Sequence, residues 1–472
     1  MHFSSESTAR SQAALAGLRV QPYWLDTPDR PDPTPPLTDD VEADLVVVGA
    51  GFTGLWTALL AKREDPSSTV VVLEGGRVAE GATGRNGGFV AASLTHGLAN
   101  GAERFEDELP DLLRMGQENL DAIEQTIEEF GIECGFVRAG EMDVAVAEHQ
   151  VEELKAMAEL AQSYGQEVEL LDAAGARALV DSSSYLAGLV DRRSVALVDP
   201  ARLAWGLAEA CRSVGVHLYE GSPVTDLLDE DDDVLVVTRS GSVRAARVAL
   251  ATNAYPPLLK RLKHYIVPVY DYVLVTEPLT ADQWAAIGWD GREGVSDAGN
   301  QFHYYRVTPD GRILWGGYDA VHHYGSTFAR EHEHDTSYFG HLAEHFMQTF
   351  PALEGISFTH GWGGAIDTCS RFSAFWGTAM GGKVGYVLGF TGLGVGASRF
   401  GAQTMLDLLN GRDTERTRLE MVRSKPIPFP PEPLRSAGIA VTTKSLAHAD
   451  RHGGRRNLWL RTLDALGMGF DS

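Results

Sequence analysis

One stretch near the start of the chain, residues 45–61, restricts the possible folds more than any other. Its sequence, LVVVGAGFTGLWTALLA, holds 17 uncharged residues in a row, just short of the roughly 18 apolar residues that a membrane-spanning helix needs. The run opens with β-branched residues, which are typical of a buried strand, and then carries three glycines. A strand that turns tightly into a helix explains both features. A second apolar run at 69–73 completes a βαβ unit and predicts a parallel sheet.

The three glycines, Gly49, Gly51 and Gly54, form the G-x-G-x-x-G pattern of a dinucleotide-binding turn. The first allows the tight turn, the second lets the backbone approach a pyrophosphate, and the third lets the helix pack closely on the strand. The N-terminus of the helix offers free N–H groups to the phosphates. Glu74 lies 20 residues after Gly54, where a carboxylate binds the ribose hydroxyls and disfavours the 2′-phosphate of NADP.

Two further glycine-rich segments favour FAD over NAD. Residues 75–90, GGRVAEGATGRNGGFV, directly follow Glu74 and offer a hydroxyl, an amide, a cation and a glycine pair, which suit a pyrophosphate and a flat ring. Residues 389–400, GFTGLGVGASRF, place four glycines at the start of another predicted helix. The N–H groups at such a helix start would stabilise the negative charge of a reduced flavin.

Composition narrows the classes of function. The net charge of -25 argues against a protein that binds nucleic acid or an anionic membrane surface. The three cysteines, Cys134, Cys211 and Cys369, are too few and too far apart for a disulfide framework, and the first ten residues contain no apolar signal segment. We therefore expect a cytoplasmic protein with no membrane span. No spacing typical of a metal site occurs.

These motifs together resemble those of the FAD-dependent oxidoreductases of the D-amino-acid-oxidase and glycine-oxidase superfamily. Within it, five segments look like the gamma-glutamylputrescine oxidoreductase branch: GATGRNGG at 81–88, VALATNAY at 248–255, TEPL at 276–279, GRILWGG at 311–317 and WGG at 362–364. The leading YWLDT at 23–27 is similar to a subgroup of aminophosphonate oxidoreductases.

The resemblance implies an α/β fold, α+β in its second part, in which a Rossmann-like FAD-binding domain interleaves with an antiparallel-sheet substrate domain. The FAD-binding domain would collect residues 38–100, 195–260 and 355–412. The substrate domain would collect residues 101–194 and 261–354. An N-terminal extension, 1–37, and a C-terminal tail, 413–472, remain.

Motif matching within the superfamily also implies the site residues. Those expected to bind FAD, without a covalent bond, are Gly49, Gly51, Phe52, Thr53, Gly54, Glu74, Ala82, Thr83, Arg85, Asn86, Gly87, Gly88, Val224, Gly389, Thr391, Gly392, Leu393 and Gly394. The catalytic candidates are Tyr304, Trp315, Asp319 and Arg371.

In this superfamily the flavin takes a hydride from the carbon beside a neutral amine nitrogen, and the imine is then hydrolysed. We therefore expect oxidation of a small-molecule primary or secondary amine, with O2 or another carrier as the electron acceptor. Asp319 would pair with a substrate ammonium, and Arg371 or Arg306 would hold an anionic far end. The pocket would be walled by aromatic residues, namely Tyr270, Tyr272, Tyr304, Tyr305, Trp315 and Tyr318.

Three points stay open at this stage. Gly396 stands where sarcosine oxidases of the superfamily carry a substrate-binding lysine, which predicts a roomier pocket and a substrate larger than glycine. Cys369 lies broadly where some of those enzymes link to flavin, so a covalent bond remains an alternative. An NAD-dependent dehydrogenase, or a flavin-binding protein without turnover, would also fit the fingerprint.

Overall fold

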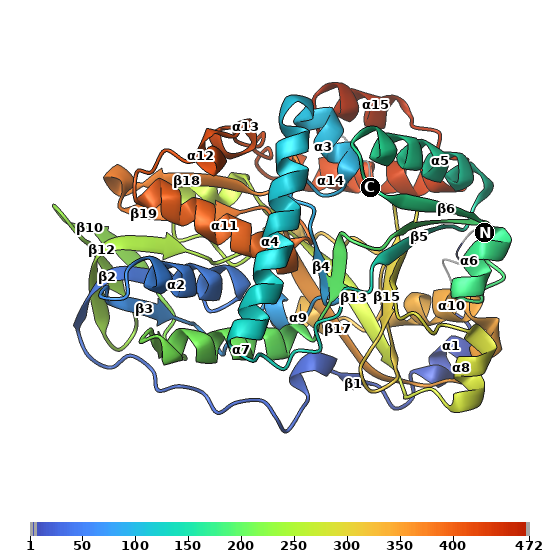
Figure 1. Cartoon of the computed structure of the whole chain (residues 1–472), viewed down its shortest axis with the longest axis horizontal. Coiled ribbons are helices and arrows are strands. Elements are labelled where there is room, and N and C mark those ends of the chain that lie inside the picture. Colours follow the sequence, from blue (N-terminus) through green and yellow to red (C-terminus); the bar gives the residue numbers. More distant parts are fainter. Residues whose placement is uncertain (1–2, 4–6, 469–472) are drawn as a thin grey trace.

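Two large β-sheets lie side by side in the computed structural model, which describes residue 3 and residues 7–468 (Figure 1). The eight-stranded sheet, at the left of the figure, runs in the order β10-β11-β12-β2-β3-β9, and β12 also pairs with β19, the partner of β18. Its strands are β2 (Val41–Val48), β3 (Val70–Leu73), β9 (His217–Tyr219), β10 (Asp226–Asp229), β11 (Val234–Val237), β12 (Ser242–Leu250), β18 (Phe375–Ala379) and β19 (Val384–Leu388).

The fingerprint strand β2 is central to this sheet, parallel to both β3 and β12. Because side chains alternate along a strand, Val47 packs under the helices on one face while Val46 joins a second core on the other. The helix α2 (Phe52–Glu64) starts directly after the glycine turn and contacts α7 (Pro200–Ser213) and α11 (Gly394–Leu409). The predicted βαβ unit and the α/β class are thereby confirmed.

The nine-stranded sheet is mixed, and most of its neighbouring strands are antiparallel. Its order is β1-β17-β13-β16-β15-β14-β5-β7-β6. The strands are β1 (Arg19–Val20), β5 (Glu141–Ala145), β6 (Val168–Asp172), β7 (Ala187–Asp191), β13 (Val267–Thr276), β14 (Gly294–Asp297), β15 (His303–Val307), β16 (Ile313–Gly317) and β17 (Phe358–Thr368). A two-stranded sheet, β4 (Phe89–Ala91) with β8 (Val195–Leu197), completes the set.

The remaining helices cover these sheets, and α4 runs along the front of the molecule between them (Figure 1). They are α1 (Ala9–Ala14), α3 (Leu98–Arg104), α4 (Leu109–Glu129), α5 (Glu148–Ser163), α6 (Ala173–Leu179), α8 (Ala281–Ile287), α9 (Arg330–Glu333), α10 (Phe339–Thr349), α12 (Glu415–Arg418), α13 (Glu420–Arg423), α14 (Leu434–Arg451) and α15 (Leu458–Ala465). None of the helices in the described ranges is long and apolar enough to cross a bilayer.

The strand pairing of two segments differs from what the implied domain division predicts. Strand β17 falls in the segment 355–412, which we expected in the FAD-binding part, yet it pairs with β13 of the nine-stranded sheet along its length. The N-terminal extension is also integrated into that sheet, because β1 pairs with β17 and α1 packs against α10. The division into two interleaved domains otherwise stays a prediction.

Candidate functional site

A cavity of about 1490 Å³ lies between the two large sheets. It is lined by the glycine turn after β2, by the segment 73–91, by residues 390–395 and by one face of β13. Binding pockets for a single drug-sized ligand usually measure about 300–1,000 Å³, so this cavity is large enough for a dinucleotide together with a small substrate.

The fingerprint glycines occupy positions where a side chain would come too close to neighbouring atoms. Gly49 has φ +104°, and a Cβ there would lie 2.7 Å from the carbonyl oxygen of Ala251. A Cβ on Gly54 would overlap the carbonyl oxygen of Gly49, and one on Gly51 would lie 2.9 Å from Oγ1 of Thr83. Because the backbone itself forms this part of the wall, its N–H groups can approach a bound pyrophosphate.

Glu74 lines the cavity at the end of β3. Its carboxylate accepts hydrogen bonds from the backbone N–H groups of Ala50, at 2.7 Å, and Gly76, at 2.8 Å. Burial raises the pKa of this carboxyl, while the two hydrogen bonds lower it. A carboxylate has about four acceptor positions, so Glu74 is fixed in orientation and still able to accept hydrogen bonds from a diol.

The loop of residues 82–88 is held from behind by three side chains. The indole N–H of Trp24 donates to the carbonyl oxygen of Asn86, and that of Trp362 to the carbonyl oxygen of Arg85, each at 2.9 Å. Nη1 of Arg306 donates to the carbonyl oxygen of Gly88 at 3.1 Å. Because these carbonyl oxygens accept hydrogen bonds on the side of the loop away from the cavity, the loop is held in one conformation.

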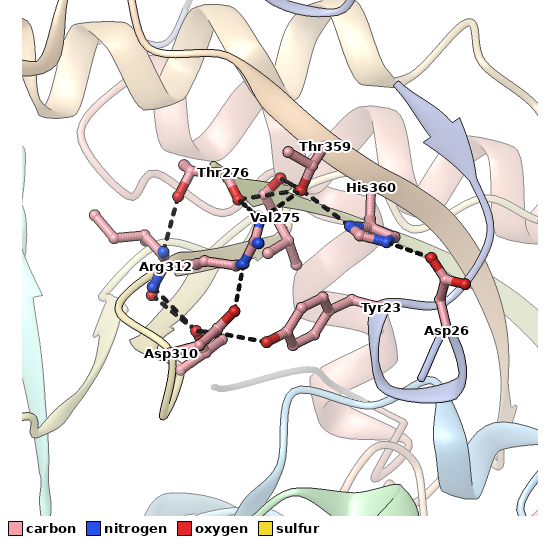
Figure 2. A network of polar contacts seen from close by, with 10 residues as sticks. Tyr23, Asp26, Val275, Thr276, Asp310, Arg312, Thr359 and His360 are labelled. Carbon is pink, nitrogen blue, oxygen red and sulfur yellow. Dashed lines mark hydrogen bonds and ion pairs between the residues drawn. The ribbon is translucent and has the colours of Figure 1, made fainter. Parts of the chain in front are cut away.

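Trp24 is itself fixed by a polar network at the edge of the nine-stranded sheet (Figure 2). Its neighbour Tyr23 donates its hydroxyl to Asp310 at 2.6 Å, and Asp26 binds Nε2 of His360 at 3.0 Å. Arg312 joins the two halves, because it contacts both Asp310 and the hydroxyl of Thr359, and that hydroxyl lies 2.9 Å from Nδ1 of His360. The N-terminal segment is therefore a structural support of the loop.

Arg85 provides a cationic group in the cavity wall. Its Nη2 lies 3.2 Å from Oε2 of Glu333, and both side chains are less than a tenth exposed. Its buried Nη1 has no hydrogen-bond partner among the described residues. A buried donor without a partner is unfavourable, so this atom fits an anionic or carbonyl oxygen of a bound cofactor.

The second glycine-rich junction lines the same cavity, through Thr391, Gly392, Leu393 and Gly394. Asp367, at the end of β17, accepts the backbone N–H of Gly389 at 2.6 Å. Burial raises the pKa of Asp367 to about 7. The junction therefore combines the start of the 16-residue helix α11 with a carboxyl that changes charge near neutral pH.

On the far side of the cavity, Asp271 projects from the middle of β13. Its Oδ2 accepts the hydroxyl of Tyr304 at 2.6 Å, and its Oδ1 accepts the backbone N–H groups of Tyr272 and Gly317, at 2.8 and 3.1 Å. Burial, together with the nearby charge of Asp319, raises the pKa of Asp271 to about 6, although the three hydrogen bonds lower it. Asp271 is thus a hydrogen-bonded carboxyl that ionises just below neutral pH.

Asp319 lines the cavity on the same side, two residues beyond β16. Its Oδ2 is buried and accepts no hydrogen bond from any described residue. Burial raises the pKa of this carboxyl. A cationic group in the cavity would therefore find a free acceptor at Oδ2 of Asp319, beside Asp271, whose carboxylate accepts three hydrogen bonds and has about one acceptor position left.

Several predicted pocket residues lie on the opposite face of the nine-stranded sheet. Trp315 is fully buried and stacks on His303, with ring centroids 4.6 Å apart. It belongs to the core cluster that also contains the tyrosines of the aromatic wall that we expected, Tyr270, Tyr272 and Tyr305. Of the six aromatic residues named for that wall, only Tyr304 and Tyr318 line the cavity within the described chain.

The arginines predicted to hold an anionic end of the substrate are engaged elsewhere. Arg371 donates to the carbonyl oxygens of Met421, at 2.8 Å, and Ser373, at 3.2 Å. Burial lowers the pKa of Arg371 to about 10. Arg306 holds the loop described above, and neither arginine is among the described residues that line the cavity.

Gly396 and Cys369 also lie outside the described cavity lining. A Cβ on Gly396 would overlap the carbonyl oxygen of Ala91, so this glycine allows α11 to approach β4 and does not widen the pocket. The thiol of Cys369 is fully buried and donates to the carbonyl oxygen of Ser373 at 3.2 Å. Burial raises its pKa, which disfavours the thiolate.

The other residues implied by motif matching lie on the cavity or next to it. Phe52, Thr53, Ala82, Thr83, Asn86, Gly87 and Val224 line it, whereas Gly54, Gly88 and Gly389 are backbone neighbours of lining residues. Sequence reasoning missed Asp271, Asp367 and the C-terminal helices. A lone carboxylate inside an apolar strand, as in VPVYDYVLVT, was a signal for Asp271.

The chain is similar to several known proteins. A family model described as FAD dependent oxidoreductase (DAO) matches residues 44–408. The gamma-glutamylputrescine oxidoreductase of Escherichia coli (strain K12) is 30% identical over 403 residues, which cover 84% of this chain and 89% of that protein. The probable oxidoreductase OrdL of Haemophilus influenzae is 30% identical over 402 residues, with the same two coverages.

The crystal structure of glycine oxidase from Geobacillus kaustophilus has the same fold, with a TM-score of 0.67 at 20% identity over 81% of this chain and 99% of that chain. The family model spans most of the chain, and two relatives are 30% identical to it over most of their length. The chain therefore belongs to the FAD-dependent oxidoreductase family, and its cofactor is FAD.

Proposed function

We propose that this enzyme oxidises the C–N bond of a primary or secondary amine larger than glycine, giving an imine that water hydrolyses to a carbonyl compound and ammonia or an amine. The observation that carries the proposal is a pair of carboxyls, Asp271 and Asp319. Both line the cavity on the side across from the glycine-rich junctions. Acidic groups suit an ammonium ion. The similarity to a gamma-glutamylputrescine oxidoreductase also supports an amine as the substrate.

We further propose that FAD occupies the part of the cavity between the two glycine-rich junctions. The backbone of the fingerprint turn would hold the pyrophosphate, Glu74 would accept the ribose hydroxyls, and Arg85 would use its free Nη1 on an oxygen of the cofactor. The start of α11 would face the pyrimidine edge of the flavin. When bound, FAD supplies the acceptor for the hydride.

The carboxyls would prepare the amine for that step. Hydride loss from the carbon beside the nitrogen requires the neutral amine, so the ammonium must first give up a proton. A base acts best when its pKa lies near the working pH, and the pKa of Asp271 is about 6. Oδ2 of Asp319 can accept an N–H from the substrate at the same time, which would orient the amine.

The test is anaerobic mixing of the purified yellow enzyme with a panel of amines. Flavin bleaching by an aminoalkyl compound, much faster than by glycine or sarcosine, is the expected result. Bleaching by sarcosine at an equal or greater rate would contradict the proposed substrate size. No bleaching by any amine, with FAD fully bound, would favour the flavin-binding protein without turnover.

A further inference from the structure

We infer that the two C-terminal helices, α14 and α15, form the distal wall of the substrate chamber and select amines that carry an apolar substituent. This inference rests on the proposed function, since it concerns the non-reacting end of the same substrate. Both helices lie beyond residue 408, where the match to the family model ends. They contribute lining residues to the same cavity as the fingerprint and the carboxyl pair.

The chemistry of this wall is mainly apolar, with Arg435, Thr442 and Thr443 as its polar lining residues on the two helices. Side chains from both helices line the cavity, among them Val441, Leu446, Leu460 and Leu463. Leu460 is almost completely buried. Each buried methylene contributes about 0.8 kcal/mol to binding through the hydrophobic effect, so a wall of this kind favours a substrate with an alkyl or aryl portion.

The two arginines of this wall are already neutralised or engaged. Arg456 lies against Asp464, with Nε 2.9 Å from Oδ2. Arg435 donates to Ser326 and to His264, at 2.8 and 2.9 Å. Arg456 is therefore neutralised by a carboxylate. Arg435 keeps its charge, but it also donates from Nε to the carbonyl oxygen of Pro430, so three of its N–H groups are already used and the apolar side chains dominate what this wall offers a substrate.

The wall is hydrogen-bonded to the loop between β14 and β15. Asp450 of α14 accepts the backbone N–H groups of Asn300, at 3.1 Å, and Gln301, at 3.0 Å. Nε2 of Gln301 in turn donates to the carbonyl oxygen of Tyr318, at 3.2 Å, directly before Asp319. These contacts hold α14 at a defined position relative to the carboxyl pair.

Other contacts hold the wall at its far end. Arg104 of α3 donates to the carbonyl oxygen of Gly467, and Gly454 lies against His149 of α5. Figure 1 shows α15 beside α3 and α5 at the top of the molecule. The helices are thus anchored at both ends, as a specificity wall requires.

The experiment uses the holoenzyme and a series of straight-chain primary amines from propylamine to octylamine. Binding to the oxidised enzyme is measured from the change in flavin absorbance, and reduction is measured separately by anaerobic bleaching. The expected result is that the dissociation constant falls about fourfold for each added methylene, because about 0.8 kcal/mol is gained per CH2. An amine with a terminal carboxylate of equal length should bind more weakly.

Two variants locate the effect. In Leu463→Gln and, independently, Leu446→Gln, the gain per methylene should shrink for the longest amines, while propylamine binds as before. The matched control is Leu458→Gln on α15, because Leu458 is 80% exposed and does not line the cavity. This control should keep the full gain.

The outcomes separate the two ideas. An equal gain per methylene in the wild type and both chamber variants, or a preference for the amine with a carboxylate, would overturn the distal wall. Binding that strengthens with chain length without any bleaching would leave the wall intact and refute amine oxidation. Bleaching with no dependence on chain length would support amine oxidation and refute the distal wall.

Discussion

Replacing Asp271 by asparagine should stabilise the protein while impairing it as an enzyme. The amide is close in shape to the carboxyl. Its oxygen can therefore still accept the N–H groups of Tyr272 and Gly317, which in the wild type donate to Oδ1. The hydroxyl of Tyr304 can turn to accept from the new amide N–H. What disappears is the negative charge inside the cavity wall.

The magnitude follows from the pKa of this carboxyl. Burial raises it from 3.8 to about 6, which corresponds to about 3 kcal/mol at roughly 1.36 kcal/mol per pKa unit. A raised pKa means that the folded state holds its proton more tightly than the unfolded chain. The associated stability is therefore complete below pH 3.8 and is lost as the pH rises through 6. The asparagine variant does not titrate, so its advantage over the wild type should grow with pH.

The assay is urea unfolding of both proteins after removal of the flavin, since cofactor binding would add its own free energy. We expect the variant to unfold with a free energy higher by about 3 kcal/mol at pH 8 and by less than about 1 kcal/mol at pH 4. An advantage that is the same at both pH values, or a variant less stable than the wild type at pH 8, would refute the assignment of a buried, titrating carboxylate.

Four other outcomes are expected. In the wild type, the rate of flavin reduction by an amine should rise with pH through about 6 as Asp271 ionises, and this step should be missing from the pH profile of the asparagine variant. Glu74→Gln should raise the dissociation constant of FAD by about 10- to 150-fold, since a hydrogen bond to a charged group is worth about 1.5–3 kcal/mol; full flavin occupancy at sub-micromolar protein would contradict this. Trp24→Phe should weaken FAD binding by several-fold, because it removes the donor to the carbonyl of Asn86, and unchanged flavin retention on dilution would show that the loop needs no such support. Acid precipitation should release all the flavin into solution, because the thiol of Cys369 is buried away from the cavity; flavin in the pellet would contradict a non-covalent cofactor.

The part of the fold that the sequence predicted well is the one in which close backbone contacts dictate the residue type. Gly49 and Gly54 are required by steric overlap with neighbouring carbonyl groups, and such a constraint is visible in the sequence as a spacing of glycines. The strand before them and the helix after them follow from local residue types. For these reasons the order and type of the elements in the first βαβ unit could be predicted, although β2 starts at Val41, four residues before the apolar run.

The substrate side could not be predicted in the same way, because it depends on the register of a hairpin. A two-residue loop within residues 308–311 would have put Tyr304 opposite Trp315, with both side chains on one face. The structure instead pairs Tyr304 with Gly316, since the backbone of Thr308 bonds to Arg312 around a three-residue loop. A slip of one residue moves every side chain to the other face, and here it decides that Tyr304, and not Trp315, meets the cavity.

The network that fixes the N-terminal segment also determines when the enzyme can be completed during its synthesis. Asp26 and His360 are separated by 334 residues, a length that a ribosome translates in about 17–67 s at roughly 5–20 residues per second. Until His360 has emerged, the segment that carries Trp24 lacks the partner that fixes Asp26. The cofactor loop therefore gains its full support only after more than three-quarters of the chain has been made, so stable binding of FAD is a late event in the synthesis of each molecule.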